Sequence, residues 1–266
     1  MTPRAPATWL TVRAQVEAVR PPTRRDFVAR YVRRNLPVLL KGAARSWRSF
    51  ARWTPQLLLE RCGEREVELE YNARCVFDFN AGAATGPVEV TRLSLREAVR
   101  RVVTADGSAG AYYLREVPVD EWVPELLPLL ERPPWIPLFS RRYVPRLWFG
   151  SAGCISPLHF DGGEENLLVH LYGRKEAMLF SPAQTPLLYP NLDGHLPHLS
   201  RVHAFAPDLA AFPRFQEAAA AWAEIEAGDV LYVPAGWWHA VRTLRTSISV
   251  NFWWNPLMPP RGAAPQ

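Results

Sequence analysis

Two short segments of the chain contain side chains whose types and spacing suit a metal ion. Residues 157–161 (PLHFD) place the imidazole of His159 two positions before the carboxylate of Asp161, and residues 236–239 (GWWH) supply a second imidazole from His239. Two imidazoles and one carboxylate are the ligand set that holds non-haem Fe(II) on one face and leaves the opposite face open for reaction. These three residues therefore predict an iron centre that activates oxygen.

The spacing of the first two candidate ligands favours a β-strand beneath them. Because alternate residues of a strand point to the same side, His159 and Asp161 would face one interior while Phe160 points away. The third ligand must come from a different strand, and His239 follows such a strand in residues 228–234 (GDVLYVP). An isolated His-x-Asp is common by chance, so the prediction depends on this combination.

The other histidines do not fit this pattern, since His170, His195, His198 and His203 lie outside both segments. A zinc pair formed by His195 and His198 is an alternative metal site. It is disfavoured because the two residues lie beside Pro197 in a loop-rich region.

Lys175 has the charge that a cosubstrate of such an iron would require. Three protein ligands leave three positions on the metal, and a 2-oxo acid would fill two of them and need a cation for its distant carboxylate. The chain has only two lysines, Lys41 and Lys175, and the second follows the first two ligands after a predicted turn at Gly173. A compact, flexible ammonium suits that carboxylate. The alternative is an exposed Arg174–Lys175 pair.

Helix signals are concentrated in the first 110 residues. Capping residues and a proline at the first helical position mark where several helices begin, and apolar or alternating runs mark two strands. The expected helices are residues 9–20, residues 24–34 capped by Thr23, one that begins at Thr54 and Pro55, and one from Ser94 to about Val103; the expected strands are residues 36–40 and 66–71.

From Ala111 onward, short apolar strands recur between Gly and Pro residues, a density that predicts a small antiparallel barrel or sandwich. Residues 182–215 form a long loop-rich insertion between two strands, and a segment of that length is usually a lid or a substrate wall. The expected strands are residues 112–114, 146–149, 167–171, 177–180, 230–233 and 247–253.

Length and composition restrict the class of protein. With 266 residues and 48% hydrophobic content the chain can bury one large core. No apolar run is long enough to cross a bilayer and no apolar signal core follows the N-terminus, so a cytoplasmic protein without a membrane partner is expected. Three widely spaced cysteines exclude a disulfide framework. The net charge of +5 comes from short, scattered arginine clusters, which favour solvated faces over a surface for an anionic partner.

Seven short motifs together resemble the JmjC-type, cupin-like (cupin_8) branch of the Fe(II)/2-oxoglutarate-dependent oxygenases. The chain is similar to two kinds of member, the asparaginyl hydroxylase of a hypoxia factor and the tRNA wybutosine hydroxylase. The similarity extends from about residue 23 to residue 254. The motifs are residues 156–161 (SPLHFD), 166–169 (NLLV), 173–175 (GRK), 179–182 (LFSP), 212–215 (FPRF), 226–234 (EAGDVLYVP) and 250–253 (VNFW).

The resemblance implies a mainly β fold with flanking helices, in which a double-stranded β-helix (jelly-roll) barrel follows an N-terminal α/β extension. It implies a single JmjC/cupin-like catalytic domain over residues 1–266. Within it, the extension covers residues 1–110, the barrel core residues 111–256 with the insertion at 182–215, and a tail residues 257–266. The oligomeric state is not specified.

The resemblance also implies a role for each candidate residue. His159, Asp161 and His239 match the iron ligands, and Lys175 matches the lysine that pairs with the distant carboxylate of 2-oxoglutarate. Tyr113 matches a tyrosine that binds the same carboxylate, with Tyr112 as the alternative. Ser156, Asn166 and Asn251 match residues that line the cosubstrate pocket. One departure is that residues 162–165 are one residue longer than the usual link between the aspartate and the asparagine.

The function implied is that of a dioxygenase that uses Fe(II), 2-oxoglutarate and O2, and that hydroxylates a protein or peptide side chain. Hydroxylation of a tRNA base or of a biosynthetic small molecule is an alternative, and demethylation of an N-methyl group ranks below hydroxylation. An alternative from another class is a non-catalytic, metal-binding cupin-like module. Lys175 discriminates between the classes, because a structural metal site has no use for it.

Overall fold

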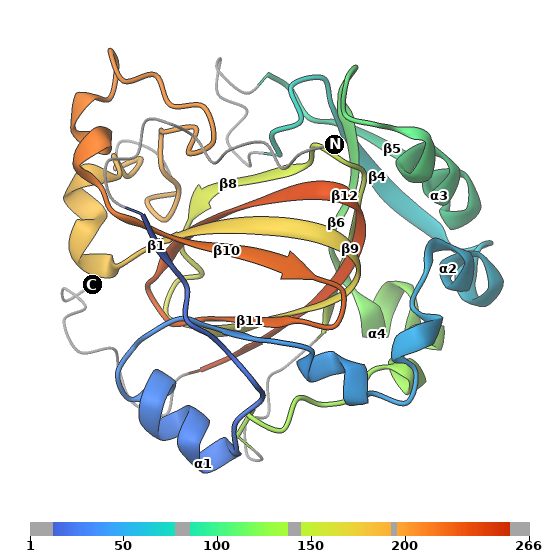
Figure 1. Ribbon diagram of the computed structural model, residues 1–266. Coiled ribbons are helices and arrows are strands. Elements are labelled where there is room, and N and C mark those ends of the chain that lie inside the picture. The colour runs from blue at the N-terminus through green and yellow to red at the C-terminus, as the bar shows by residue number, and fades with distance from the viewer. Residues whose placement is uncertain (1–12, 78–85, 138–144, 193–195, 256–266) are drawn as a thin grey trace.

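The computed structural model describes residues 13–77, 86–137, 145–192 and 196–255, and two long strands organise it. These are β9 (Glu165–Phe180) and β12 (Trp238–Trp254), which pair antiparallel along nearly their whole length. Both strands bend strongly and enclose a central interior (Figure 1). The predicted jelly-roll architecture is confirmed.

Each half of the long pair is flanked by different strands, so that the sheet folds over on itself. On one side β11 (Val230–Val233) pairs with residues 166–169 of β9, and β7 (Arg146–Gly150) pairs with residues 247–251 of β12. On the other side β10 (Ala220–Glu226) pairs with residues 174–179 of β9, and β8 (Ile155–His159) pairs with residues 239–242 of β12. We call these the first and second half-sheets.

The N-terminal extension adds strands to the first half-sheet rather than forming a separate unit. β3 (Val38–Leu40) pairs with β11, and β4 (Glu66–Asn72) and β5 (Glu89–Ser94) extend the sheet beyond β6 (Ala111–Pro118), a core strand that pairs with β7. One hydrophobic cluster joins Phe27 and Leu40 of the extension to Val230 and Trp254 of the barrel.

The helices begin where the capping residues predict. α1 (Arg24–Phe27) is capped by Thr23 and continues as a π-helical turn, Val28–Val32; α2 (Pro55–Cys62) is capped by Thr54; and α3 (Leu95–Thr104) is capped by Ser94. α2 and α3 lie together outside β4 and β5 (Figure 1). The remaining short helices are α4 (Val119–Trp122) and the 3-10 turns Ala43–Ser46, Phe50–Arg52, Pro124–Leu129, Pro182–Leu187 and Pro213–Glu217.

The helix expected over residues 9–20 is wrong where the structure describes it, and its start lies outside the described residues. The segment instead forms β1 (Arg13–Gln15) and β2 (Ala18–Val19), which pair parallel with β10 and β3. Edge pairing supplies hydrogen bonds that an isolated amphipathic pattern cannot reveal. No helix among the described residues is long and apolar enough to cross a membrane.

The turn predicted at Gly173 is also wrong, because the two strands expected around it are one continuous strand. Gly173 has a φ of 83° and lies where β9 passes from the first half-sheet to the second. β12 shifts register at the same level, between Thr243 and Ile248. A glycine inside a strand marks a close approach of backbones, and here a Cβ would lie 2.1 Å from the carbonyl oxygen of Thr246.

Substituting Gly173 with alanine is expected to lower the free energy of unfolding by about 3 kcal/mol or more, because a positive φ and a clash with backbone act together. Gly162→Ala is the matched control: its φ is 58° but nothing lies within 4 Å of the added Cβ, so about 1 kcal/mol is expected. Urea denaturation of both variants measures the difference, and equal losses would show that the close approach at Gly173 is unimportant.

Candidate metal centre

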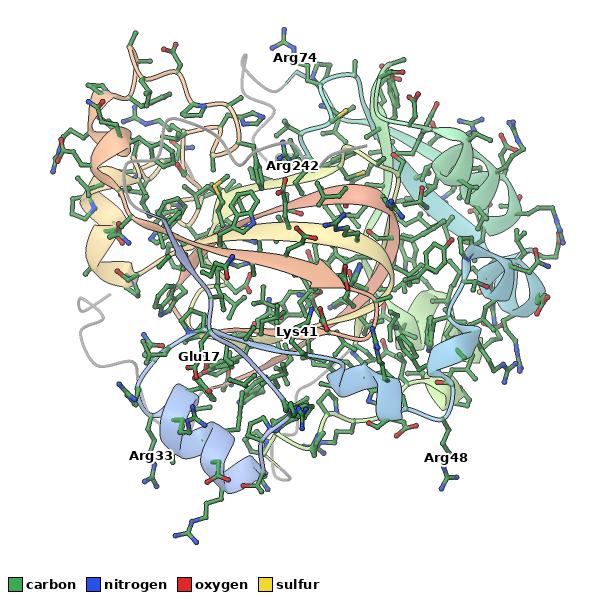
Figure 2. All side chains as sticks on the ribbon, viewed as in Figure 1. Glu17, Arg33, Lys41, Arg48, Arg74 and Arg242 are labelled. Atoms are coloured by element: carbon green, nitrogen blue, oxygen red, sulfur yellow. The ribbon has the colours of Figure 1, made fainter. Side chains whose placement is uncertain are left out.

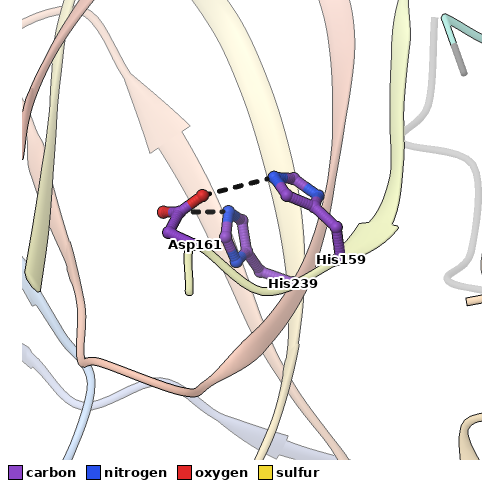
Figure 3. A group of neighbouring side chains, drawn as sticks. All are labelled: His159, Asp161 and His239. Carbon is purple, nitrogen blue, oxygen red and sulfur yellow. Dashed lines mark ion pairs between the residues drawn. The ribbon is translucent and has the colours of Figure 1, made fainter. Parts of the chain in front are cut away.

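The two histidines of the candidate centre lie directly opposite each other on neighbouring strands of the second half-sheet. His159 ends β8 and is paired with His239, the second residue of β12. Their ring centroids lie 4.3 Å apart. Asp161 follows two residues after His159, and one ligand atom from each of the three side chains lies within 4.8 Å of the others (Figure 3).

The predicted strand supports His159 but ends before Asp161. The amide of Phe160 donates a hydrogen bond to the carbonyl of His198 in the insertion, at 3.1 Å, so the chain leaves the sheet there. The side chain of Phe160 packs against Trp238 with ring centroids 4.8 Å apart, away from the centre, as predicted. The insertion, rather than strand alternation alone, therefore directs Asp161 toward the two imidazoles.

Both imidazoles are oriented by backbone carbonyls two residues earlier in the chain. Nδ1 of His159 lies 2.7 Å from the carbonyl oxygen of Pro157, and Nδ1 of His239 lies 3.3 Å from that of Trp237. A ring N–H held by a carbonyl leaves the opposite nitrogen free to coordinate a metal. The two Nε2 atoms lie 3.4 and 3.7 Å from oxygens of Asp161.

The electrostatics of the three residues suit a cation. Burial, followed by repulsion from His159, lowers the pKa of His239 to about 4, so this imidazole is neutral at pH 7. Burial favours the neutral form of Asp161, but the two histidines and the Trp253 N–H outweigh it and lower the pKa of the carboxyl. Burial also opposes protonation of His159, but its contact with Asp161 raises the pKa overall. An ionised carboxylate beside a neutral imidazole is the state that a metal needs.

The centre opens into a cavity of about 680 Å³, within the size range of small-molecule sites. It lies between the two half-sheets, and its walls come from β6, β7, β8, β9, β11 and β12. All eight residues predicted for the site line this cavity: Tyr113, Ser156, His159, Asp161, Asn166, Lys175, His239 and Asn251.

Lys175 is the buried cation of the cavity, only 1% exposed. Its Nζ lies 3.3 Å from the hydroxyl of Tyr113, and no carboxylate of the described residues pairs with it. Burial lowers the pKa of the ammonium to about 8. A buried ammonium that contacts one neutral hydroxyl lacks a compensating anion, which is the observation that fits the carboxylate of a bound dicarboxylic acid.

Strand alternation places the two candidate tyrosines on opposite faces of the sheet. Tyr113 faces the cavity, whereas Tyr112 packs against Tyr71 on the other face of the sheet, with ring centroids 4.9 Å apart. Burial raises the pKa of Tyr113, and the hydroxyl of Ser156 bonds to it. Tyr113 therefore stays a neutral hydroxyl beside Lys175.

Asn166 and Asn251 line the cavity but are engaged with other protein groups. The amide of Asn251 donates to the Oδ1 of Asn166 at 2.9 Å, and the amide of Asn166 donates to Oδ2 of Asp161 at 2.7 Å. The two asparagines thus form a relay to the carboxylate of Asp161.

The cavity is also lined by residues that sequence reasoning did not assign to the site, and four of them are polar or aromatic side chains from three parts of the chain. Trp148 and Arg146 come from β7, Glu116 from a bulge in β6 where its φ is 54°, and His198 from the insertion. The sequence offered one usable signal, the length of the insertion, because a long segment between strands often forms a wall of the site.

Comparisons with known proteins agree with this geometry. The family described as the cupin-like domain matches residues 24–258. Lysine-specific demethylase 8 of Xenopus tropicalis is 30% identical over 237 residues, 88% of this chain and 51% of that protein. Jumonji C domain-containing protein 5 of Drosophila melanogaster is 26% identical over 94% of this chain and 62% of its own length. HSPB1-associated protein 1 of Rattus norvegicus is 39% identical, but over only 40% of this chain and 23% of its own length. The chain thus spans about half to three fifths of the first two.

Proposed function

The chain belongs to the cupin-like domain family, and from that premise we propose that it is an Fe(II)- and 2-oxoglutarate-dependent dioxygenase that hydroxylates a side chain of a protein or peptide. One observation carries the proposal: the His159–Asp161–His239 centre and a buried, uncompensated ammonium open into the same cavity. A structural metal site would need the first feature but not the second.

Each group has a distinct task in the proposed reaction. His159, Asp161 and His239 would hold Fe(II), which with 2-oxoglutarate and O2 supplies the oxidising chemistry that yields succinate and CO2 and inserts oxygen into a C–H bond. Lys175 and Tyr113 would bind the distant carboxylate of the cosubstrate. Trp148 and Trp253, whose ring centroids lie 6.4 Å apart, add apolar surface to the wall of the cavity.

A protein substrate is supported by the names of relatives, of which several are lysine-specific demethylases. Those names also favour a second candidate, removal of an N-methyl group from lysine. The two candidates share the same first step, because hydroxylation of an N-methyl carbon releases formaldehyde. They differ only in which carbon lies next to the iron.

The decisive experiment measures succinate from the purified chain supplied with Fe(II), 2-oxoglutarate and O2. Slow succinate formation that requires all three components is expected, and it should rise when a peptide library contains a substrate. Mass spectrometry of the peptide then discriminates the candidates: a gain of one oxygen atom indicates hydroxylation, and loss of a methyl group with formaldehyde indicates demethylation. Tight metal binding without any succinate would overturn the proposal and indicate a non-catalytic metal-binding module.

A further inference from the structure

The two oxygens of the Asp161 carboxylate have different surroundings. Oδ2 accepts two hydrogen bonds, one from the amide of Asn166 at 2.7 Å and one from the indole N–H of Trp253 at 3.0 Å. Oδ1 accepts neither of these bonds and lies 3.4 Å from Nε2 of His159, whereas Oδ2 lies 3.7 Å from Nε2 of His239. Two donors match the two lone pairs of a carboxylate oxygen, so Oδ2 is fully occupied by the protein.

Both donors come from the half-sheet opposite the histidines. Asn166 on β9 and Trp253 on β12 are paired in register at the end of the first half-sheet, and they reach across the cavity mouth to a residue that follows β8. The carboxylate of Asp161 is therefore held from the half-sheet opposite the one that carries the histidines.

Neither donor is free to turn away. Asn166 is 1% exposed, and its Oδ1 accepts the amide of Asn251 at 2.9 Å, which fixes the NH2 group toward Asp161. Trp253 has a single donor and no acceptor, and its ring packs against Trp148 with centroids 6.4 Å apart. Ionised acceptors strengthen such hydrogen bonds about twofold over neutral ones.

We propose that Trp253 and Asn166 are positioning residues that occupy Oδ2 of Asp161 and present Oδ1 alone to the metal. A carboxylate held in this way ligates through one oxygen in one orientation, which leaves coordination positions for cosubstrate and oxygen. The proposal rests on the proposed iron site. It assigns Asn166 to the metal carboxylate instead of the cosubstrate, at the position that follows the lengthened 162–165 link.

Trp253→Phe tests the indole donor, because it keeps an aromatic ring beside Trp148 and removes the N–H; the loss of ring volume is matched in the control. Titration with Co(II), followed by its visible absorbance, is expected to show an affinity about 10- to 100-fold weaker than that of the unmodified protein. Trp135→Phe is the matched control: this buried indole donates to the carbonyl of Pro22 at 3.1 Å instead of to Asp161, and it does not line the cavity. Its affinity for Co(II) should not change.

Asn166→Ala supplies the second, independent donor test and should weaken Co(II) binding by a similar factor. Unchanged affinity in both Trp253→Phe and Asn166→Ala would overturn the inference, as would an equal loss in Trp135→Phe. If the proposed iron site itself is wrong, the results differ. The unmodified protein would then bind no Co(II), or His159→Ala would bind Co(II) as well as the unmodified protein does.

Discussion

Replacing Asp161 with alanine is expected to eliminate tight Fe(II) binding and 2-oxoglutarate-dependent succinate formation. The carboxylate is the single anionic ligand of the centre, and its pKa is lowered, so it is ionised across the physiological range. Loss of an outer partner of a metal ligand already costs about 10- to 100-fold in affinity, so loss of the ligand should cost more than about 100-fold. His159→Ala should have the same effect. Metal titration and succinate release measure the two losses separately.

His203→Ala is the matched control, because it shows whether the effect of His159→Ala is specific to a metal-ligand position or follows from the loss of any histidine. His203 lies in the insertion, accepts a hydrogen bond from the amide of Ala206 and does not line the cavity. His203→Ala should therefore bind Fe(II) and form succinate as the unmodified protein does. Undiminished turnover in both His159→Ala and Asp161→Ala would refute the assignment of the iron ligands.

The pairing of the first two candidate ligands could be predicted because its signal is local. Asp161 lies two positions after His159, and strand alternation predicts a shared direction for that spacing, although β8 itself ends at His159. Helix starts at Thr23, Thr54 and Ser94 were predictable for the same reason, since a cap acts on amides two or three residues away.

Features that depend on distant parts of the chain were not predictable. A glycine such as Gly173 usually interrupts a strand, and only the matching register shift in β12 shows that here it lets the strand bend. His198 approaches the site because residues 198–200 bond to β8 and its extension. The relay from Asn251 through Asn166 joins three segments, so no single spacing in the sequence indicates it.

Replacing Lys175 with methionine is expected to weaken 2-oxoglutarate binding by at least about 30-fold, because truncating one partner of a buried charge pair costs about 2 kcal/mol or more. The same substitution should leave the cosubstrate-free protein equally stable or more stable. Methionine fills the volume of the aliphatic stem, and it removes an ammonium whose burial, at 1% exposure with one hydroxyl contact, is uncompensated. Calorimetry and urea denaturation measure the two effects.

Lys41→Met provides the control, because it should lower the stability of the protein and leave its affinity for 2-oxoglutarate unchanged. Nζ of Lys41 lies 2.6 Å from Oδ2 of Asp229, which is 1% exposed. Lys41→Met would leave that buried carboxylate without its cation, so it should destabilise the protein. Lys41 does not line the cavity, and 2-oxoglutarate affinity should be unchanged.

The lowered pKa of Lys175 should make both the stability of the protein and its affinity for 2-oxoglutarate depend on pH. A lysine that serves only the fold would affect the stability alone. The folded-state pKa of Lys175, about 8, lies below the ordinary value of 10.5, so the unfolded chain binds more protons between these values. Stability of the cosubstrate-free protein should therefore rise from pH 8 to about 10.5 by an amount of order 3 kcal/mol. Affinity for 2-oxoglutarate should fall over the same window, because the ammonium loses its proton. Lys175→Met should abolish both pH trends. If the variant instead is less stable and binds 2-oxoglutarate as well as the unmodified protein does, Lys175 serves the fold and the cavity does not hold a dicarboxylic acid.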